Sequence, residues 1–305
     1  MVSDFLHIPA CQGEKVCVAI GVFDGVHQGH RKIIAALAEM AAAHTATAVA
    51  LTFFPHPKAV LCGHEPPLLT PLSRRVQLLR EAGADEVGII EFTPEFAAMP
   101  PEQFLEELLH NNGGCKVCGV AVGSNWRFGK NGSGTPAMLT AAGLKSGFQF
   151  RSLTLLTADG ARISSSLIRQ KEAAGEMETV RQLLGRNFEL YGTVVRDLHI
   201  GTTELGFPTA NLALEAGVPP PDGVYAGLLE GMPAAVNIGI SPSVAANGNR
   251  HRVEAHIIGR TVELNGDHVK LELLKKIRGE KKFPSFEALK EQISADIQAI
   301  RSFLS

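Results

Sequence analysis

The first half of the chain alternates short apolar runs with segments whose apolar residues recur at helical spacing. The apolar runs predict β-strands at Val16–Val22, Thr47–Phe53, Glu86–Ile90 and Val117–Val122. The segments between them predict α-helices at Arg31–Ala43, Ser73–Glu81 and Pro101–His110. Strands that alternate with helices pair in parallel, so the first half is expected to form a doubly wound sheet.

From Tyr191 onward the pattern changes to short apolar runs separated by turn residues, which is typical of an antiparallel sheet closed into a small barrel. The expected strands are Gly192–Val195, Val224–Leu229, Ala234–Ile238, Val253–Ile258 and His268–Leu274.

A last helix is expected from about Phe286 to Phe303, capped by Ser285. The residues expected to pack on the barrel are Phe286, Leu289, Ile293, Ile297 and Ile300. Glu172–Leu184 predicts one helix that leads across the domain boundary, so the predicted domains are 1–184 and 185–305.

Composition supports two globular domains and limits the partners. The chain has 305 residues, of which 45% are hydrophobic and 20% charged, with a formal net charge of -2. Such a balance lacks the basic surface that an extended nucleic-acid or anionic-membrane footprint needs. Met1–Ala10 does not read as a signal peptide, and no apolar stretch is long enough to span a membrane. We therefore expect a cytoplasmic protein with small-molecule partners, and leave its oligomeric state open between a monomer and weak self-association.

The five cysteines do not form a disulfide framework. Their number is odd and they are scattered over Cys11, Cys17, Cys62, Cys115 and Cys118. Cys115 and Cys118 form one CxxC, but a structural zinc site needs further ligands at matching spacing. We interpret this pair as small residues that enter a buried strand.

A glycine- and histidine-rich segment, Gly21–His30, directly follows the first predicted strand and opens the first helix. A helix N-terminus favours phosphate, and ligands of open parallel sheets lie at the carboxyl ends of strands. Gly25 and Gly29 permit close approach of a polyphosphate to the backbone. His27 and His30 are three residues apart and can stabilise charge on one phosphoryl group. The alternative is a tight turn with two incidental histidines, but the strand–turn–helix context favours a nucleotide site.

Two further segments belong to the same prediction. Thr52–Pro57 ends the second predicted strand, and its two prolines around His56 give a rigid loop end. Arg162–Arg169 begins a helix with three serines whose hydroxyl groups can cap it or bind phosphate, and Arg169 can clamp an anion. By itself the serine run is more often a plain helix cap.

A second chemical site is predicted in the β half at Leu205–Asn211. Gly206 permits close approach, Pro208 stiffens the segment, and Thr209 and Asn211 point to one side of an extended chain. Oxygen ligands of this kind, together with substrate phosphates, suit Mg²⁺. Taken alone the segment also fits a capped turn. Glu254 stands inside an apolar strand pattern, where it either points into the barrel with a chemical task or faces solvent.

At these residues the sequence resembles the prokaryotic bifunctional riboflavin kinase/FMN adenylyltransferase family, also called FAD synthetases. The resemblance runs from about Val16 to Leu304. In the first half it rests on GVFDGVHQGH, TFFPHP, VGSNWRFG and ISSSLIR. In the second half it rests on LGFPTAN, DGVYA, NIG followed by Pro242, VEAHI and the segment Ile277–Phe283.

The resemblance implies an α/β nucleotidyltransferase domain with a Rossmann-like parallel sheet, followed by a six-stranded antiparallel β-barrel domain with a C-terminal helix. It implies phosphorylation of riboflavin to FMN by ATP, and adenylyl transfer from ATP to FMN that gives FAD and pyrophosphate, with Mg²⁺ at the phosphates.

The resemblance also implies roles for individual residues. The catalytic residues would be His27, His30 and Glu254, and the metal ligands Thr209 and Asn211. ATP and its phosphates would contact Gly21, Phe23, Asp24, Gly25, Gly29, Ser164, Ser165, Arg169, Gly206 and Pro208. The flavin would contact His56, Pro57, Asn125, Trp126, Arg127 and Phe128. The rings of Phe23 and Phe128 are equally well read as core.

Several positions depart from the family pattern. Phe54 replaces an acidic residue, and Ser166 replaces a threonine. Thr202-Thr203 and Ser241 alter the two loops of the kinase half. One alternative is therefore an FAD synthetase with a silent kinase half. A non-catalytic flavin-responsive regulator is a second, although it predicts loss of the catalytic residues, which are present. A transferase for another substrate leaves the β half unexplained.

Overall fold

The protein is described by a computed structural model, which contains two compact units. The described residues are 8, 13–110, 112–154, 156–158, 160–195, 207–215, 219–240, 251–260, 262–264 and 266–305. The first unit comprises residues 1–68 and 72–164, and the second comprises residues 69–71 and 165–305. The segment from Ser165 to Leu184, which the predicted domain boundary assigns to the first domain, is thus grouped with the second unit.

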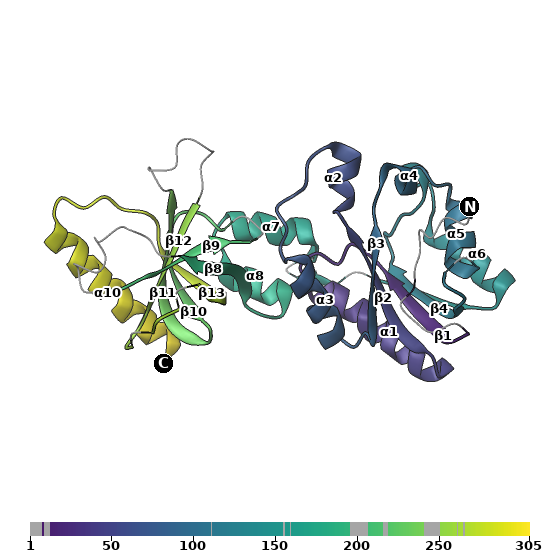
Figure 1. Cartoon of the computed structure of the whole chain (residues 1–305), viewed down its shortest axis with the longest axis horizontal. Helices are drawn as coiled ribbons and strands as arrows, with labels where there is room; N and C mark the ends of the chain where they lie inside the picture. Colours follow the sequence, from purple (N-terminus) through teal and green to yellow (C-terminus); the bar gives the residue numbers. More distant parts are fainter. Residues whose placement is uncertain are drawn as a thin grey trace. The chain divides into compact units, whose positions relative to one another are not determined.

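The first unit is built on a parallel sheet of five strands in the order β3-β2-β1-β4-β5. Figure 1 labels β1 to β4 of this sheet. The strands are β1 (Lys15–Ile20), β2 (Thr47–Phe54), β3 (Glu86–Glu91), β4 (Lys116–Gly123) and β5 (Gln149–Leu153). All four neighbouring pairs are parallel. The predicted doubly wound sheet is confirmed, and four of its strands lie within three residues of their predicted ends.

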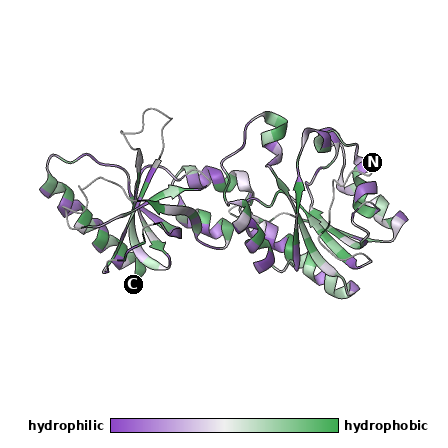
Figure 2. Cartoon of the chain, in the orientation of Figure 1, coloured by the Kyte–Doolittle hydropathy of each residue, from purple (hydrophilic) through white to green (hydrophobic). Residues whose placement is uncertain are grey.

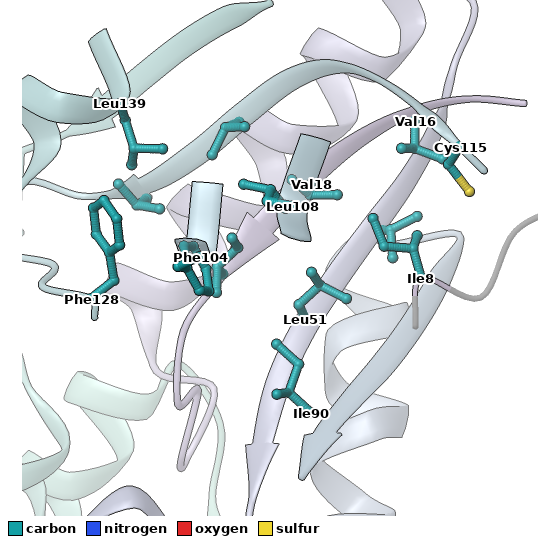
Figure 3. Packing of buried hydrophobic residues seen from close by; sticks show 14 of the residues in the cluster. Ile8, Val16, Val18, Leu51, Ile90, Phe104, Leu108, Cys115, Phe128 and Leu139 are labelled. Atoms are coloured by element: carbon teal, nitrogen blue, oxygen red, sulfur yellow. The ribbon is translucent and has the colours of Figure 1, made fainter. Parts of the chain in front are cut away.

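Helices cover both faces of this sheet because β1 is apolar on both. Val16, Val18 and Ile20 belong to one buried cluster, which also holds residues of α5 (Pro101–Leu109) and α6 (Pro136–Ser146). Figure 3 shows part of this cluster, with Val18 of β1 near Leu108 and Phe104 of α5. Cys17 and Ala19 face the opposite cluster with α1 (Gln28–His44) and α3 (Leu72–Glu81). Figure 2 shows the consequence, since the strands are mainly green and the helices carry purple stretches.

Some elements of the first unit were not predicted. They are α2 (Pro57–Cys62), α4 (Pro94–Ala97), α6, β5, the 3-10 turn η1 (Lys130–Gly132) and the two-residue strands β6 (Thr157–Ala158) and β7 (Ala161–Arg162). Most are too short for a periodic pattern. β5 lies at the sheet edge and has no fully buried residue, so it lacks the apolar run that marks the other strands.

The second unit contains a closed barrel of six antiparallel strands in the order β10-β11-β12-β9-β8-β13. The strands are β8 (Phe188–Val195), β9 (Ala210–Leu214), β10 (Gly223–Leu229), β11 (Met232–Ile240), β12 (His251–Ile257) and β13 (His268–Arg278). Side chains alternate across each strand, so Val236 and Ile238 on β11 and Val253 and Ala255 on β12 fill the core. The predicted small barrel is confirmed.

β9 is the barrel strand that periodicity missed. Its sequence ANLAL has one buried residue, Leu212, and begins in a segment rich in turn-forming residues. Pairing with β8 on one side and β12 on the other makes it a strand. Tertiary contacts therefore override a weak local pattern here.

The last helix is α10 (Phe286–Leu304), capped by Ser285 as predicted. Ile300 is fully buried, but Phe286 is 68% exposed, so its predicted packing on the barrel is wrong. Phe286 is the first residue of α10 and lies at the end that projects from the strands in Figure 1. The helix is also held by a buried carboxylate, because Arg278 donates to both oxygens of Asp296 at 2.8–3.1 Å.

The predicted single helix over Glu172–Leu184 is wrong. The structure has two helices, α7 (Ser165–Ala173) and α8 (Met177–Leu184). They are separated at Gly175, whose φ of 75° favours glycine and where a Cβ would lie 2.9 Å from the Lys276 side chain. α8 packs on β8 and β13. Within the described ranges, no helix has the length and apolarity that a membrane span requires.

Glu172, near the end of α7, is a buried carboxyl that Glu172→Gln is expected to relieve. The residue is 6% exposed and burial raises its pKa from 4.5 to about 7, opposed by the nearby Arg169 charge. The folded state thus favours the neutral form. The resulting penalty is absent at low pH, grows as pH rises from 4.5 to about 7, and is complete above that. At pH 8 the variant should be more stable by up to about 3 kcal/mol, and at pH 4 unchanged.

Urea unfolding at both pH values measures this difference. Glu176→Gln is the matched control, because Glu176 is half exposed and pairs with Lys171 on the surface. Equal stability of Glu172→Gln and wild type at pH 8 would show that the buried carboxyl carries no penalty.

Candidate functional site

The strand order places two predicted segments at the switch point of the first sheet. From β1 the chain winds through β2 to β3 on one side and then returns to β4 on the other. Open parallel sheets bind ligands at the carboxyl ends of strands at such a point. Gly21–His30 follows β1 there, and Ser124–Phe128 follows β4. The topology therefore brings together segments about 100 residues apart in sequence.

His27 and His30 form a stacked pair at the start of α1. His27 is the N-cap, and its Nδ1 accepts a hydrogen bond from the His30 backbone N–H at 3.2 Å. The two rings are 3.6 Å apart between centroids and nearly parallel, and the Phe23 ring is perpendicular to that of His30 with the centroids 5.2 Å apart. Because Nδ1 of His27 accepts, a neutral His27 carries its proton on Nε2 and can donate from there.

His30 has a buried ring atom that hydrogen bonds within the described residues do not satisfy. This atom is Nδ1. Burial, followed by the charges of His27 and Arg75, lowers the pKa of His30 well below its usual value, so the ring is neutral at neutral pH. A buried polar atom without a partner is costly, and a bound ligand can supply the missing hydrogen bond.

Arg75, on α3, is a residue of this site that the sequence analysis missed. Its Nη1 lies 3.2 Å from the carbonyl oxygens of both Val22 and Phe53, and its Nη2 is 3.9 Å from Asp24 Oδ1. Arg75 and Asp24 are each 1% exposed. The guanidinium therefore joins the carboxyl ends of β1 and β2. Helical spacing could have indicated its burial, because Arg75 is three and four residues from the buried Leu78 and Leu79 and therefore lies on the same face of α3.

The turn after β1 owes its shape to residues in the left-handed region. Phe23, Gly25 and Val26 have φ of 51°, 82° and 36°, which is unusual for the two that are not glycine. Phe23 is fully buried in the core, so its ring serves packing, and its predicted ATP contact stays a prediction. The Asp24 carboxylate likewise faces Arg75, so Asp24 helps to hold the shape of the turn.

The segment before α7 approaches the start of α1. A Cβ on Gly29 would meet the His27 ring at 3.1 Å and lie 4.0 Å from the Ile163 carbonyl oxygen. This contact places the residue before Ser164 beside the histidine pair. Ser165 and Arg169 lie on α7 in the second unit, so their predicted phosphate contacts stay predictions.

The predicted flavin contacts after β4 are partly core and partly accessible. Trp126 and Phe128 stack at 5.0 Å, and Phe104 packs against both. Phe128 is buried, Trp126 is half-buried, and Asn125 and Arg127 are exposed. After β2, His56 caps α2 by accepting from the Lys58 N–H, and Pro57 begins that helix. Phe54 is 45% exposed.

A cavity of about 370 Å³ lies between the barrel strands β10–β12 and α10. Its apolar lining includes Phe207, Leu289 and Ile293, and its polar lining includes Glu254 and Thr209. Enclosed, largely apolar cavities with a few polar groups are the usual form of small-molecule sites. Leu289 and Ile293 therefore line the cavity, whereas the sequence analysis expected them only to pack on the barrel.

Glu254 neither points into the barrel interior nor faces solvent, the two positions that the sequence analysis considered. It alternates with the core residues Val253 and Ala255, so it does not point into the barrel. It is nevertheless only 6% exposed. Its Oε2 accepts from Asn237 Nδ2 at 3.3 Å, and it forms an ion pair with Arg252. The carboxylate is therefore enclosed on the outer face of β12, beside the cavity.

The predicted metal ligands lie near this carboxylate. Asn211 is paired with Glu254 across β9 and β12, and its Oδ1 accepts from Arg252 Nε at 3.3 Å. Thr209 lines the cavity, and the carbonyl oxygen of the exposed Pro208 accepts from His256 Nδ1 at 2.9 Å. Gly206, Thr202-Thr203 and Ser241 lie outside the described residues.

The described residues contain no cluster of three or more histidine, cysteine, aspartate or glutamate side chains that could hold a metal ion. Cys17, Cys62, Cys115 and Cys118 form no disulfide with one another, and Cys115 and Cys118 are buried where β4 begins, as expected.

Comparisons with known proteins match both halves. A sequence model described as FAD synthetase matches residues 10–167, and one described as riboflavin kinase matches residues 184–304. The chain is 36% identical to a bifunctional riboflavin kinase/FMN adenylyltransferase of Escherichia coli, over 95% of this chain and 93% of that protein. The chain belongs to the bifunctional riboflavin kinase/FMN adenylyltransferase family.

Other relatives agree in length and fold. A Bacillus subtilis protein with the same description is 33% identical over 97% of this chain and 95% of its own length. A crystal structure of a Streptococcus pneumoniae protein, described as a macrolide-efflux protein, has a TM-score of 0.85 at 25% identity. It covers 96% of this chain and 95% of its own chain. The predictions of the family, the fold class and a two-activity enzyme are confirmed, since both the nucleotidyltransferase and the kinase halves are matched.

Proposed function

We propose that the barrel unit transfers the γ-phosphoryl group of ATP to riboflavin, with Glu254 as the general base. The observation that supports this role best is the enclosed Glu254 carboxylate between the cavity and the Asn211–Arg252 pair. Riboflavin would occupy the cavity, with its ring system against Phe207, Leu289 and Ile293. Glu254 would accept the proton of the 5′-hydroxyl as its oxygen attacks the γ-phosphorus in line and ADP leaves.

The residues beside Glu254 fit a magnesium–nucleotide complex. Thr209 and Asn211 offer a hydroxyl and an amide oxygen, and Mg²⁺ commonly takes one or two protein oxygens together with substrate phosphates. Asn211 Oδ1 already faces a positive group, the Arg252 guanidinium. When bound, Mg²⁺ would neutralise phosphate charge, while Thr209 and Asn211 hold the nucleotide in register with Glu254.

The first unit would adenylylate FMN at the switch point. An oxygen of the FMN phosphate would attack the α-phosphorus of ATP, and pyrophosphate would leave. His27 Nε2–H and His30 would donate to the charged phosphoryl oxygens, which also supplies a partner for His30 Nδ1. Ser164, at the end of the first unit, would help to hold the pyrophosphate. The flavin would lie near Asn125, Trp126 and Arg127, with His56 and Pro57 across the site.

The domain boundary, the location in the cell and the absence of macromolecular partners also stay predictions. The first family match ends at residue 167 and the second begins at residue 184. The predicted domain boundary at 184/185 lies directly after the interval between them. A cytoplasmic location, and a monomer or weak self-associate that does not bind nucleic acid, likewise stay predictions.

The first experiment is to incubate the purified chain with riboflavin, ATP and MgCl₂, and to separate the flavins by chromatography over time. FMN that rises first and FAD that follows are the expected result. FAD formed from supplied FMN but not from riboflavin would identify a silent kinase half, the alternative suggested by the altered residues Thr202-Thr203 and Ser241. No product from either flavin would overturn the proposal.

A further inference from the structure

Arg252 places a positive charge on two groups of the proposed kinase site at once. Its Nε donates to Asn211 Oδ1 at 3.3 Å, and its guanidinium forms an ion pair with Glu254. One of these groups is the proposed nucleotide-holding residue and the other is the proposed general base. The motifs singled out in the sequence include Asn211 and Glu254 but leave Arg252 without a role.

The strand register explains this position. Glu254 is opposite both Asn211 on β9 and Asn237 on β11, and Arg252 is two residues earlier on β12. Side chains two residues apart on a strand share a face, so Arg252 lies on the outer face beside Glu254. The Arg252 side chain is 30% exposed whereas that of Glu254 is 7% exposed. The guanidinium therefore borders the solvent side of the carboxylate, and Glu254 separates it from the cavity.

A guanidinium in this place is suited to phosphate. Arginine binds phosphate through two parallel N–H···O bonds and is less strongly hydrated than lysine. ATP held by Thr209 and Asn211 would bring several negative charges to within reach of Arg252. A guanidinium that is partly exposed can exchange one carboxylate partner for a phosphate without first leaving a buried position.

We propose that Arg252 binds the phosphate chain of ATP in the kinase site and exchanges Glu254 for a phosphate oxygen when the nucleotide binds. The inference rests on the proposed riboflavin kinase activity of the barrel. The exchange has a second consequence, because it leaves a Glu254 oxygen open to the riboflavin hydroxyl. ATP binding thus prepares the base for its substrate.

The test compares Arg252→Gln with the wild type in the full-length chain. Loss of charge-assisted hydrogen bonds to phosphate should raise the KM for ATP in riboflavin phosphorylation by about 10- to 100-fold. Arg252→Lys keeps the charge but lacks the two parallel N–H groups, so its KM for ATP should lie between those of the wild type and Arg252→Gln. Adenylylation of supplied FMN should keep its KM for ATP, which gives an internal control for folding. Arg260→Gln, at an exposed arginine beyond the end of β12, controls for the change in charge.

A second readout does not depend on turnover. Calorimetric titration with the magnesium complex of the β,γ-imido analogue of ATP, without flavin, should show two classes of site in the wild type. One class should weaken by about 10- to 100-fold in Arg252→Gln. Unchanged affinity of both classes would overturn the inference, as would a higher kcat with unchanged affinity, which would make Arg252 only a restraint on Glu254. If the wild type makes no FMN, the proposed function fails, whereas the titration still reports on Arg252.

Discussion

Replacing Glu254 with glutamine is expected to lower kcat for riboflavin phosphorylation by about 10²–10⁴-fold, the usual contribution of a general base. Glutamine keeps the size of the side chain and can still accept from Asn237, but a neutral amide does not take up the hydroxyl proton. Conversion of supplied FMN to FAD should proceed at the wild-type rate, because the residues proposed for that step do not include Glu254. Initial rates of the two reactions, measured separately by chromatography, test both halves of this expectation.

Glu272→Gln is the matched control for this variant. Like Glu254, Glu272 is a barrel carboxylate that accepts a hydrogen bond from an asparagine, Asn187, and pairs with a basic residue, Lys270. Unlike Glu254, it does not line the cavity. Its replacement should leave kcat within about threefold, because the Glu272 side chain, which is 15% exposed, does not line the cavity. A comparable loss in both variants would assign the effect to the barrel structure and not to proton transfer.

Replacing Arg75 with methionine is expected to destabilise the first unit by about 3–5 kcal/mol, the cost of leaving one partner of a buried ion pair without the other. The variant loses the guanidinium that contacts Asp24 and the carbonyl oxygens of Val22 and Phe53. Because Val22 and Asp24 belong to the turn that carries His27 and His30, adenylylation should fail at a lower temperature. Scanning calorimetry should show an earlier transition for the first unit, with riboflavin phosphorylation retained.

Two further variants separate charge from packing. Arg74→Met, one residue earlier, removes a pair with the exposed Glu81 and should cost less than about 1 kcal/mol. Asp24→Asn combined with Arg75→Met should recover part of the loss, with a coupling of about 0.5–3 kcal/mol. Additive effects of the two substitutions would show that Arg75 acts by filling space and not through Asp24.

Periodicity predicted the fold well where one element has a clear apolar run or face. β1 and α1 were found because Val16–Ile20 and Ile33–Met40 bury residues at the spacing that each element requires. β5 and β9 were missed because an edge strand and a strand with one buried residue owe their form to neighbours. The Phe286 prediction was wrong because spacing assigns a face but not the length over which the partner extends.

The candidate sites show the same division between local and distant information. The motifs around His27, His30, Asn211 and Glu254 are visible as residue types at short spacing. Arg75 acts from another helix, and Arg252 acts through the register of three strands, so neither is marked by a local motif. The cavity beside Glu254 also depends on α10, which packs against β11 and β13 and supplies part of the lining.

The distribution of aromatic residues makes the two units optically distinct. The chain has one tryptophan, Trp126, and two tyrosines, Tyr191 and Tyr225. Trp126 stacks on Phe128 in the first unit, whereas both tyrosines lie on barrel strands. Emission excited at the red edge of protein absorbance therefore originates from the nucleotidyltransferase half alone, and tyrosine absorbance reports the kinase half. Each half carries its own spectroscopic label, without any added dye.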